Sequence, residues 1–415
     1  MGSGNGDPIT YGIDNAGKMI MVGANGTSTV SSVTESAIIE ALIKSGTYSS
    51  NGIIGLEIDY ENKSFARLQD AYGKSAGADF NSYKMYGGRM RCNVADDGTI
   101  NAFYGDPTYI EDGSNGEVMV YQPKFYYERL ILKTEYSNNG TVIRKEALLL
   151  SDEPRTGFKL HPLFLDGENE LDYALLPAYE GSVENDKLNS RAGKKPISNT
   201  VLTTLENYAR AHGTGWDVTN MAFESAIQML EIVEFGNMNG QNSLDKGICN
   251  ISDVDNYNCA SLTGSTTGLG NTSGIATETI NEVNGTQTTY NESGKRAISY
   301  RGMENPWGNI WRMISGAKVI GSNTNNGGTV YIYSGTGYQS VGFNLPSVGG
   351  YISAIGYSND YDWLYIPIEC QNANSAMPVG DSIWTTPNPT KENIVAVGGK
   401  WNFEEQNGPF AYAFD

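Results

Sequence analysis

Histidine and cysteine, which enzymes often use for nucleophilic and proton-transfer chemistry, are rare in this sequence. Its 415 residues include two histidines, His161 and His212, and four cysteines. His161 precedes a proline and His212 follows the predicted end of a helix, which favours a structural or surface role for both. No H-E-x-x-H motif, phosphate-binding glycine loop or C-x-x-C pair is present. The sequence therefore predicts no metal centre and no cofactor.

Carboxylates are the remaining candidates for catalysis. Two of them can hydrolyse a glycosidic bond when one acts as an acid and the other as a base or nucleophile. Asp360 with Asp362, and Glu404 with Glu405, are candidate pairs, but nothing in their spacing separates them from the other acidic residues. We therefore expect no enzymatic activity and keep a glycan depolymerase as the least favoured alternative.

Residues suited to recognition gather in the last part of the chain. Tyrosine and tryptophan provide rigid contact area, and neighbouring amide, hydroxyl and carboxylate groups provide adaptable hydrogen bonds. Such mixtures occur at Gly349–Pro367 and Gly398–Tyr412. A β-rich protein also carries many tyrosines and asparagines for structural reasons, and Trp363 could be buried. The predicted ligand-binding residues are Tyr338, Tyr351, Tyr357, Asn359, Asp360, Tyr361, Trp363, Asn402, Glu404, Glu405, Gln406 and Asn407.

The composition indicates short strands joined by many turns, since there are 50 glycines. The formal net charge of −19 would repel nucleic-acid phosphates and anionic lipids, so neither is an expected partner. No apolar run reaches the roughly 18–20 residues of a membrane span, so no membrane insertion is expected. Cys249 and Cys259 could form a disulfide or remain free thiols.

Residues 1–50 differ in texture from the rest. A glycine-rich start leads to a predicted strand at Lys18–Val22 and then to a short helix at Thr34–Gly46, which Thr34 can cap and Gly46 can end. The apolar stripe of this helix needs a partner surface. We expect residues 1–50 to be an attachment or oligomerisation segment, and residues 51–415 to form the main domain.

Strand patterns open the main domain. Alternating apolar and polar residues predict a β-hairpin that turns at Glu61–Lys63. A strong strand signal covers Glu117–Leu132, and Pro123 within it suggests an edge or a bulge. Lys145–Ser151 is predicted to pair with that strand.

Two helices are predicted in the middle of the chain. The first is near Thr203–Ala211, and the second is near Asn220–Phe235, with one apolar face against the core. Asn242–Asn291 is polar and poor in large apolar residues, which predicts a long surface insertion or a poorly ordered loop.

Two tryptophan motifs carry a resemblance to a known family. Gly-Asn-x-Trp occurs at Gly308–Trp311, and Gly-Gly-x-Trp occurs at Gly398–Trp401. With the strand VYQPKFYYE and the tryptophan-containing segment Gly213–Leu230, this order resembles the C-type-lectin-like fold of formylglycine-generating-enzyme relatives. The resemblance covers roughly Ile53–Asp415. It implies an α+β fold of mixed short strands with two helices, preceded by a small N-terminal segment.

The sequence departs from the enzymatic and calcium-binding branches of that family. Formylglycine-generating enzymes use two nearby cysteines close to the C-terminus, and here only Cys370 lies in that region. The Glu-Pro-Asn of calcium-dependent lectins appears only as the scrambled Glu304, Asn305 and Pro306. These departures favour a binding protein over an enzyme and leave calcium binding undecided.

Further segments resemble the tail-fibre and variable receptor-binding proteins of gut bacteriophages, including the variable proteins of diversity-generating retroelements. They are Tyr83–Asp106, Asp186–Pro196 and Val233–Gln241. The resemblance implies a virion protein at a tail-fibre tip, a homotrimer that contacts other tail proteins, and a ligand face at about residues 300–415. Its receptor would be a glycan or protein of the bacterial surface, and retroelement-directed mutation would vary its asparagine-rich loops. A bacterial surface or pilus-tip adhesin is the alternative.

Overall fold

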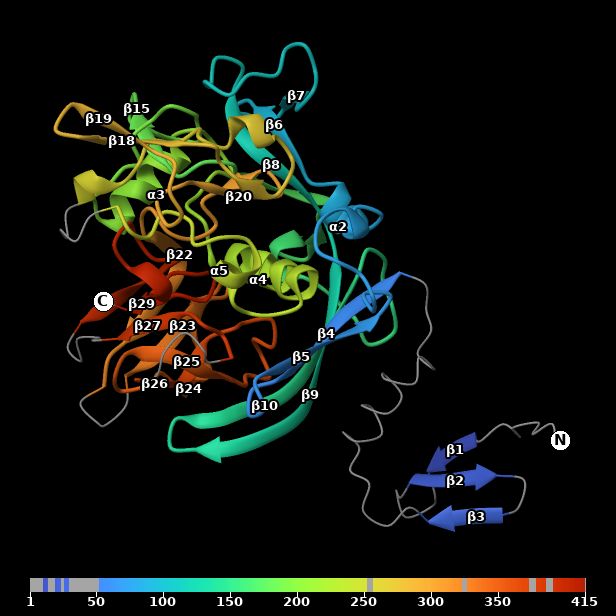
Figure 1. Cartoon of the computed structure of the whole chain (residues 1–415). Helices are drawn as coiled ribbons and strands as arrows, with labels where there is room; N and C mark the ends of the chain where they lie inside the picture. Colours follow the sequence, from blue (N-terminus) through green and yellow to red (C-terminus); the bar gives the residue numbers. More distant parts are fainter. Residues whose placement is uncertain are drawn as a thin grey trace. The chain divides into compact units, whose positions relative to one another are not determined.

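The computed structural model describes residues 10–13, 19–23 and 26–29, and then residues 52–251, 257–322, 327–372, 378–385 and 391–414. The chain divides into two compact units, Met1–Ser49 and Ser50–Asp415 (Figure 1). The first contains an antiparallel sheet of β1 (Thr10–Ile13), β2 (Met19–Gly23) and β3 (Gly26–Thr29). The strand predicted at Lys18–Val22 is confirmed as β2. The helix predicted at Thr34–Gly46 lies outside the described residues.

The expected C-type-lectin-like α+β fold is wrong, because the chain is mostly β. Strands make up about 40% of it and helices about 13%. One sheet contains 13 strands, ten of them in the order β11-β9-β10-β25-β27-β29-β28-β22-β23-β24, with β4, β5 and β26 paired off this path. The strands of this sheet are β4 (Ile53–Asp59), β5 (Ser64–Gln69), β9 (Tyr126–Ser137), β10 (Gly140–Ser151), β11 (Lys159–Leu160), β22 (Arg312–Ile320), β23 (Thr329–Tyr333), β24 (Tyr338–Asn344), β25 (Gly350–Gly356), β26 (Pro367–Gln371), β27 (Ser382–Thr385), β28 (Glu392–Val397) and β29 (Tyr412–Phe414).

The pairing of β10 with β25 explains why short motifs predicted the wrong fold. Val142 and Ile143 of β10 lie opposite Gly356 and Ile355 of β25, so a sheet begun near residue 53 continues into the last hundred residues. A turn motif fixes the local backbone. It carries no information about which distant strands pair, and that pairing decides the fold.

Smaller sheets surround the large one. A four-stranded sheet has the order β14-β8-β6-β7, and a three-stranded sheet has the order β17-β20-β21. The remaining strands form three isolated hairpins. The bounds are β6 (Met90–Val94), β7 (Ile100–Phe103), β8 (Glu117–Pro123), β12 (Leu165–Asp166), β13 (Asn169–Glu170), β14 (Tyr173–Pro177), β15 (Ser182–Glu184), β16 (Lys187–Asn189), β17 (Gly274–Ile275), β18 (Thr279–Val283), β19 (Thr286–Tyr290), β20 (Ile298–Tyr300) and β21 (Met303–Glu304).

The helices of the described residues are few and mostly short. Only α3 (Leu202–Arg210) and α4 (Met221–Phe235) exceed four residues, and both lie where the sequence predicts helices. No described helix has the length and apolar character needed to cross a membrane. The others are α2 (Lys84–Gly87), α5 (Gly240–Ser243), η1 (Ala78–Phe80), η2 (Pro162–Phe164), η3 (Tyr257–Cys259), η4 (Thr267–Leu269) and η5 (Glu404–Gln406).

The strand predictions of the main domain are largely confirmed. β4 and β5 form the predicted hairpin, and β9 pairs with β10 from Ser137 and Gly140 to Tyr126 and Ser151. Pro123 does not sit inside one strand, because it ends β8, and β9 then begins in a different sheet. A residue without a backbone N–H can end a ladder, and here it marks the change of sheet.

Helix α4 lies in the middle of the larger unit (Figure 1). Asn220 caps it by accepting a hydrogen bond from the amide of Phe223 at 3.0 Å, and Gly236 ends it in the left-handed conformation. The sequence predicts one buried face, yet 13 of the 15 residues are buried. The polar residues of this helix therefore need partners inside the protein.

Arginines from other segments pair with two of the buried carboxylates of α4. Glu234 binds Arg301 at 2.6 Å, and Glu224 binds Arg312 at 3.0 Å. For Glu231, burial raises the pKa well above its usual value, and Arg89 is the largest opposing influence. A buried ion pair is stable only while both charges remain, because removal of one side chain leaves the charge of the other buried without a partner.

The Gly-Asn-x-Trp segment is held by hydrogen bonds to a buried carboxylate and to buried backbone. Asn309 has φ of 58°, and its side-chain oxygen accepts from the amide of Ser261 at 2.7 Å. The side-chain nitrogen of Asn309 donates to the carboxylate of Glu180 at 2.5 Å. The amide of Gly308 donates to the carbonyl of Gly398 at 3.0 Å, so the two tryptophan motifs lie side by side.

Residues 242–291 are not the poorly ordered insertion that their composition suggests, in the part that the structure describes. Cys259, Ala260 and Ala276 join Trp401 in a small hydrophobic core. Glu304 accepts hydrogen bonds from the amides of Gly264 at 2.8 Å and Thr266 at 2.7 Å. Small buried side chains and hydrogen bonds to backbone amides replace the large apolar residues that sequence patterns detect.

Replacing Arg301 by alanine should strongly destabilise the protein, because it leaves the Glu234 carboxylate buried without its charge partner. The expected loss is about 3–5 kcal/mol of unfolding free energy, measured by urea denaturation. Lys84→Ala is the control, since it removes an exposed ion pair with Glu153 and should not shift the transition. Equal transitions for the two variants would contradict a dominant role for the buried pair.

Glu180 should make stability depend on pH in the opposite direction from an ordinary carboxylate. Burial raises its pKa to about 8, which is above the value in the unfolded chain. The stability that protonated Glu180 contributes is therefore fully present below pH about 4.5 and is lost as pH rises through about 8. Glu180→Gln should therefore gain stability relative to the wild type between pH 5 and pH 8, by on the order of 1 kcal/mol per pH unit. A difference that stays constant between these pH values, in denaturant titrations, would show that Glu180 does not titrate there.

Candidate ligand-binding site

A cavity of about 450 Å³ opens among the C-terminal strands. Its wall combines one exposed indole with amide and hydroxyl groups, a mixture typical of small-molecule sites. Tyr351 comes from β25, Trp384 from β27 and Gln406 from η5. The lining residues are Gly349, Gly350, Tyr351, Asn372, Ile383, Trp384, Thr385 and Gln406.

The floor of the cavity is rigid backbone. β25 pairs with β27 through Gly350 opposite Ile383 and Tyr351 opposite Ser382. A side chain at position 349 would place its Cβ 2.7 Å from the carbonyl oxygen of Ile383, so only glycine allows this close approach. Side chains that project from paired strands keep their positions better than those on long loops.

Polar groups converge on the cavity. The Tyr351 hydroxyl donates to Glu405 at 2.8 Å, and burial together with this carboxylate raises the pKa of Tyr351 above its usual value. The Ser382 hydroxyl lies 3.3 Å from the side-chain oxygen of Gln406. The hydroxyl of Thr385 is buried and has no hydrogen-bond partner among the described residues. Its burial, like that of Ile383 two positions earlier, places this hydroxyl on the inner face of β27.

An aromatic cluster borders the same cavity. The Trp384 side chain is 52% exposed, and its ring centroid lies 6.5 Å from that of Phe403. Phe403 in turn contacts Trp311 edge to face at 5.4 Å. This geometry braces an exposed indole against two half-buried rings.

The predicted ligand-binding residues fall into separate groups. Tyr351 and Gln406 line the cavity, and Glu405 contacts Tyr351. Asn402 and Glu404 lie in the same C-terminal turn and its short helix η5.

A second group lies at the other end of β25. Tyr357, Asn359, Asp360 and Tyr361 follow its last residue, whereas Tyr351 is its second residue. Six residues of strand span about 20 Å, so this group does not share the cavity. Tyr338 stands apart on the edge strand β24.

Two of the predicted residues are buried. Trp363 is 8% exposed and packs against His161 and Tyr361. Asn407 is fully buried, because its side chain accepts from the amide of Lys400 at 2.8 Å and donates to its carbonyl at 2.9 Å. In this arrangement both residues hold the scaffold and neither faces a ligand.

The most exposed aromatic of the site escaped sequence reasoning. Trp384 and Thr385 lie in the short run SIWT, between residues without strong motif character. The sequence signal that could have found Trp384 is the alternation of side chains along a strand. Because Ile383 points inward, its neighbour Trp384 must point outward. Phe403 and Trp311 were also missed as contacts of the site.

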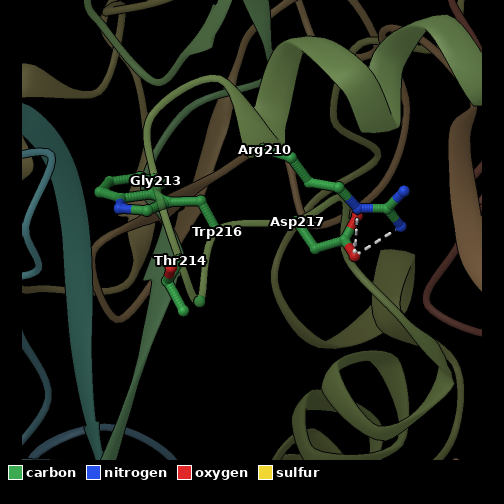
Figure 2. Close-up of a pocket in the computed structure, with 6 residues that line it drawn as sticks. Arg210, Gly213, Thr214, Trp216 and Asp217 are labelled. Carbon is green, nitrogen blue, oxygen red and sulfur yellow. Dashed lines mark hydrogen bonds and ion pairs between the residues drawn. The ribbon is translucent and has the colours of Figure 1, made fainter.

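A second depression, of about 590 Å³, lies at the end of α3 (Figure 2). Arg210 binds Asp217 at 2.9 Å across it, and Trp216 points to the other side. The Trp216 ring stacks on His212 at 4.6 Å. The charged and aromatic groups of this depression already have partners within the chain, which makes it the weaker candidate.

Neither histidine is arranged for catalysis. His161 accepts from the amide of Leu163 at 3.2 Å through Nδ1, so its Nε2 carries the proton and donates to Ser225. Ser225 donates to the carbonyl of Trp363. A serine nucleophile needs the reverse direction, with the hydroxyl donating to the imidazole. Burial also lowers the pKa of His161 to about 3.

Other reactive groups are placed equally unfavourably. A G-x-S-x-G sequence occurs at Gly73–Gly77, but Ser75 lies in an exposed turn, and its amide donates to Asp79 at 2.8 Å. That geometry is no strand-to-helix nucleophile elbow. All four cysteines are free thiols, so Cys249 and Cys259 are not bridged. In the described part of the chain, no three histidine, cysteine or acidic side chains lie together as metal ligands.

A scan against protein-family models found no match to this chain, and a search of curated proteins found none either. The site is therefore interpreted from its own geometry.

Asn407→Ala should destabilise the protein, since it removes two buried hydrogen bonds that close the turn at Lys400. The expected loss is about 1–3 kcal/mol of unfolding free energy, measured by denaturant titration. Asn359→Ala is the matched control, because Asn359 is exposed and its change should stay within about 0.5 kcal/mol. Indistinguishable transitions would show that Asn407 does not hold the scaffold.

Proposed function

We propose that this chain is a receptor-binding protein at the tip of a bacteriophage tail fibre, and that it contacts a receptor on the bacterial surface through the Trp384 cavity. The observation that carries the proposal is an exposed indole beside the Tyr351–Glu405 pair, Gln406 and Asn372. Hot spots of recognition surfaces are typically aromatic anchors surrounded by polar groups.

The likeness of several segments to phage receptor-binding proteins supports this proposal from the sequence side. It depends on the segments and not on the overall fold, since the expected fold was wrong. The position of the cavity agrees with it, because all its lining residues lie within 349–406, inside the region where the sequence predicts recognition.

The chemistry of the surface also favours binding over turnover. The buried pair His161–Ser225 has its hydrogen bonds in the wrong direction for a nucleophile, and the strands β25 and β27 beside the cavity are paired with each other. As part of the proposal we include a homotrimer, in which three weak sites would act together on a repetitive surface.

Replacing Trp384 by alanine should reduce adsorption to bacteria by at least about tenfold, because it removes the exposed anchor of the cavity. The measurement is the amount of fluorescently labelled protein bound to cells of a panel of cultured gut bacteria. Gln406→Ala should weaken adsorption in the same direction. Tyr136→Ala is the control, since Tyr136 is 83% exposed on the distant β9–β10 hairpin.

Adsorption to no strain of the panel would contradict the receptor-binding function. Adsorption by Trp384→Ala and Gln406→Ala equal to that of Tyr136→Ala would contradict the placement of the site. Equal thermal unfolding midpoints of the variants ensure that a loss reflects the surface.

A further inference from the structure

The large sheet has one face that turns away from the core. Its inner face carries buried apolar residues such as Val319, Val330 and Val395. The strand register places the alternate residues on the opposite face, because side chains of neighbouring positions point to opposite sides. Trp384, Ala413, Ala396 and Met313 form one row across β27, β29, β28 and β22.

A second row continues this outer face toward the edge of the sheet. Ile394 lies opposite Lys318, Lys318 opposite Tyr331, and Tyr331 opposite Ser340.

Beyond that row, Tyr333 pairs with Tyr338, and their rings meet edge to face at 5.4 Å. These two tyrosines are 52% and 41% exposed. From β27 to β24 the face crosses six strands, which is about 24 Å at ~4.8 Å per strand.

Trp384 belongs both to this face and to the wall of the cavity. Ala413 beside it is partly exposed and has no bulk to cover the indole, so the cavity opens toward the sheet at this point. Ala396, one strand further, is only 5% exposed, so a ligand that continues toward Tyr333 and Tyr338 lies above the side chains that cover this alanine.

We propose that the receptor is an extended polysaccharide without net charge, an inference that rests on the proposed receptor-binding function. One sugar unit occupies the cavity, with its ring on Trp384 and its hydroxyls bonded to the side-chain amides of Gln406 and Asn372. The following units lie on the outer face of the sheet, between Trp384 and the tyrosine pair Tyr333–Tyr338.

The groups of the cavity favour a sugar over a protein partner. A protein interface needs a buried apolar centre, whereas the cavity presents one exposed indole, braced by Phe403, among amide and backbone groups. The apolar faces of a sugar ring match the indole, and its hydroxyls match the side-chain amides of Gln406 and Asn372.

The charges around the cavity exclude an acidic polymer. None of the described residues that line it is cationic, and Glu404 and Glu405 lie beside it. On the outer face, Lys318 is already paired with Glu392. With a net charge of −19 on the whole chain, an anionic polysaccharide would be repelled.

The class of receptor is tested first, on cells of a strain that adsorbs the protein. Periodate, which cleaves vicinal diols of sugars, should abolish adsorption, whereas proteinase K should leave it unchanged. If adsorption is lost after protease treatment and kept after periodate treatment, the receptor is not a polysaccharide, and the proposed receptor-binding function still stands. Adsorption to no strain would overturn both.

The extended site is tested next, with polysaccharide purified from that strain and separated into long chains and short fragments. Trp384→Ala should bind both at least about tenfold more weakly. The double variant Tyr333→Ser/Tyr338→Ser should bind long chains about fivefold more weakly and short fragments normally. Normal binding of short fragments also shows that this variant is folded.

Two results would overturn the extended, uncharged ligand. Long chains that bind the double tyrosine variant as tightly as the wild type would remove the outer face from the site. Affinity for long chains that falls more than about twofold between roughly 50 and 500 mM NaCl would indicate a charged polymer. Tyr136→Ser is the control for both measurements.

Discussion

The burial of charge on α4 is the constraint on which the rest of the structure depends. A helix with carboxylates on several faces cannot enter a protein interior unless cations enter with it. Arg301 pairs with Glu234 and Arg312 pairs with Glu224, whereas burial raises the pKa of Glu231 well above its usual value, with Arg89 as the main opposing charge. Segments more than two hundred residues apart therefore assemble around one helix. Arg312 lies on β22 of the large sheet, Arg301 follows β20 and Arg89 precedes β6, so segments of three different sheets supply these arginines.

This constraint extends to the ligand site. The side-chain amide of Gln228 on α4 donates to the carbonyl of Pro409 at 2.8 Å. The next residue, Phe410, donates its amide to the buried carboxylate of Asp381 at 2.8 Å. Asp381 directly precedes β27, which carries Trp384. A short chain of buried hydrogen bonds thus connects the central helix to the turn and the strand on either side of the cavity.

Local patterns in the sequence predicted local structure well. The helices, the β4–β5 hairpin and the β9–β10 pair were found because each depends on residues close in the chain. The fold was not, because the pairing of β10 with β25 has no signature in either strand. For the site, Tyr351, Glu405 and Gln406 were predicted and do meet. Trp384 was missed because one exposed indole in a four-residue strand looks like any core residue. Asn407 was included because an asparagine in a loop gives no sign of the backbone that it holds.

The buried Asn407 and Asp381 have a consequence for how such a surface can change over time. Each lies close in sequence to a residue that lines the cavity. Asn407 follows the partly exposed Gln406, and Asp381 lies three residues before the exposed Trp384. Inherited change in the exposed residues alters what is recognised, while the buried neighbours keep the backbone in place. Folding and specificity are therefore divided between adjacent positions. For the proposed receptor-binding protein, a few surface substitutions would then change the receptor that is bound without passing through misfolded intermediates.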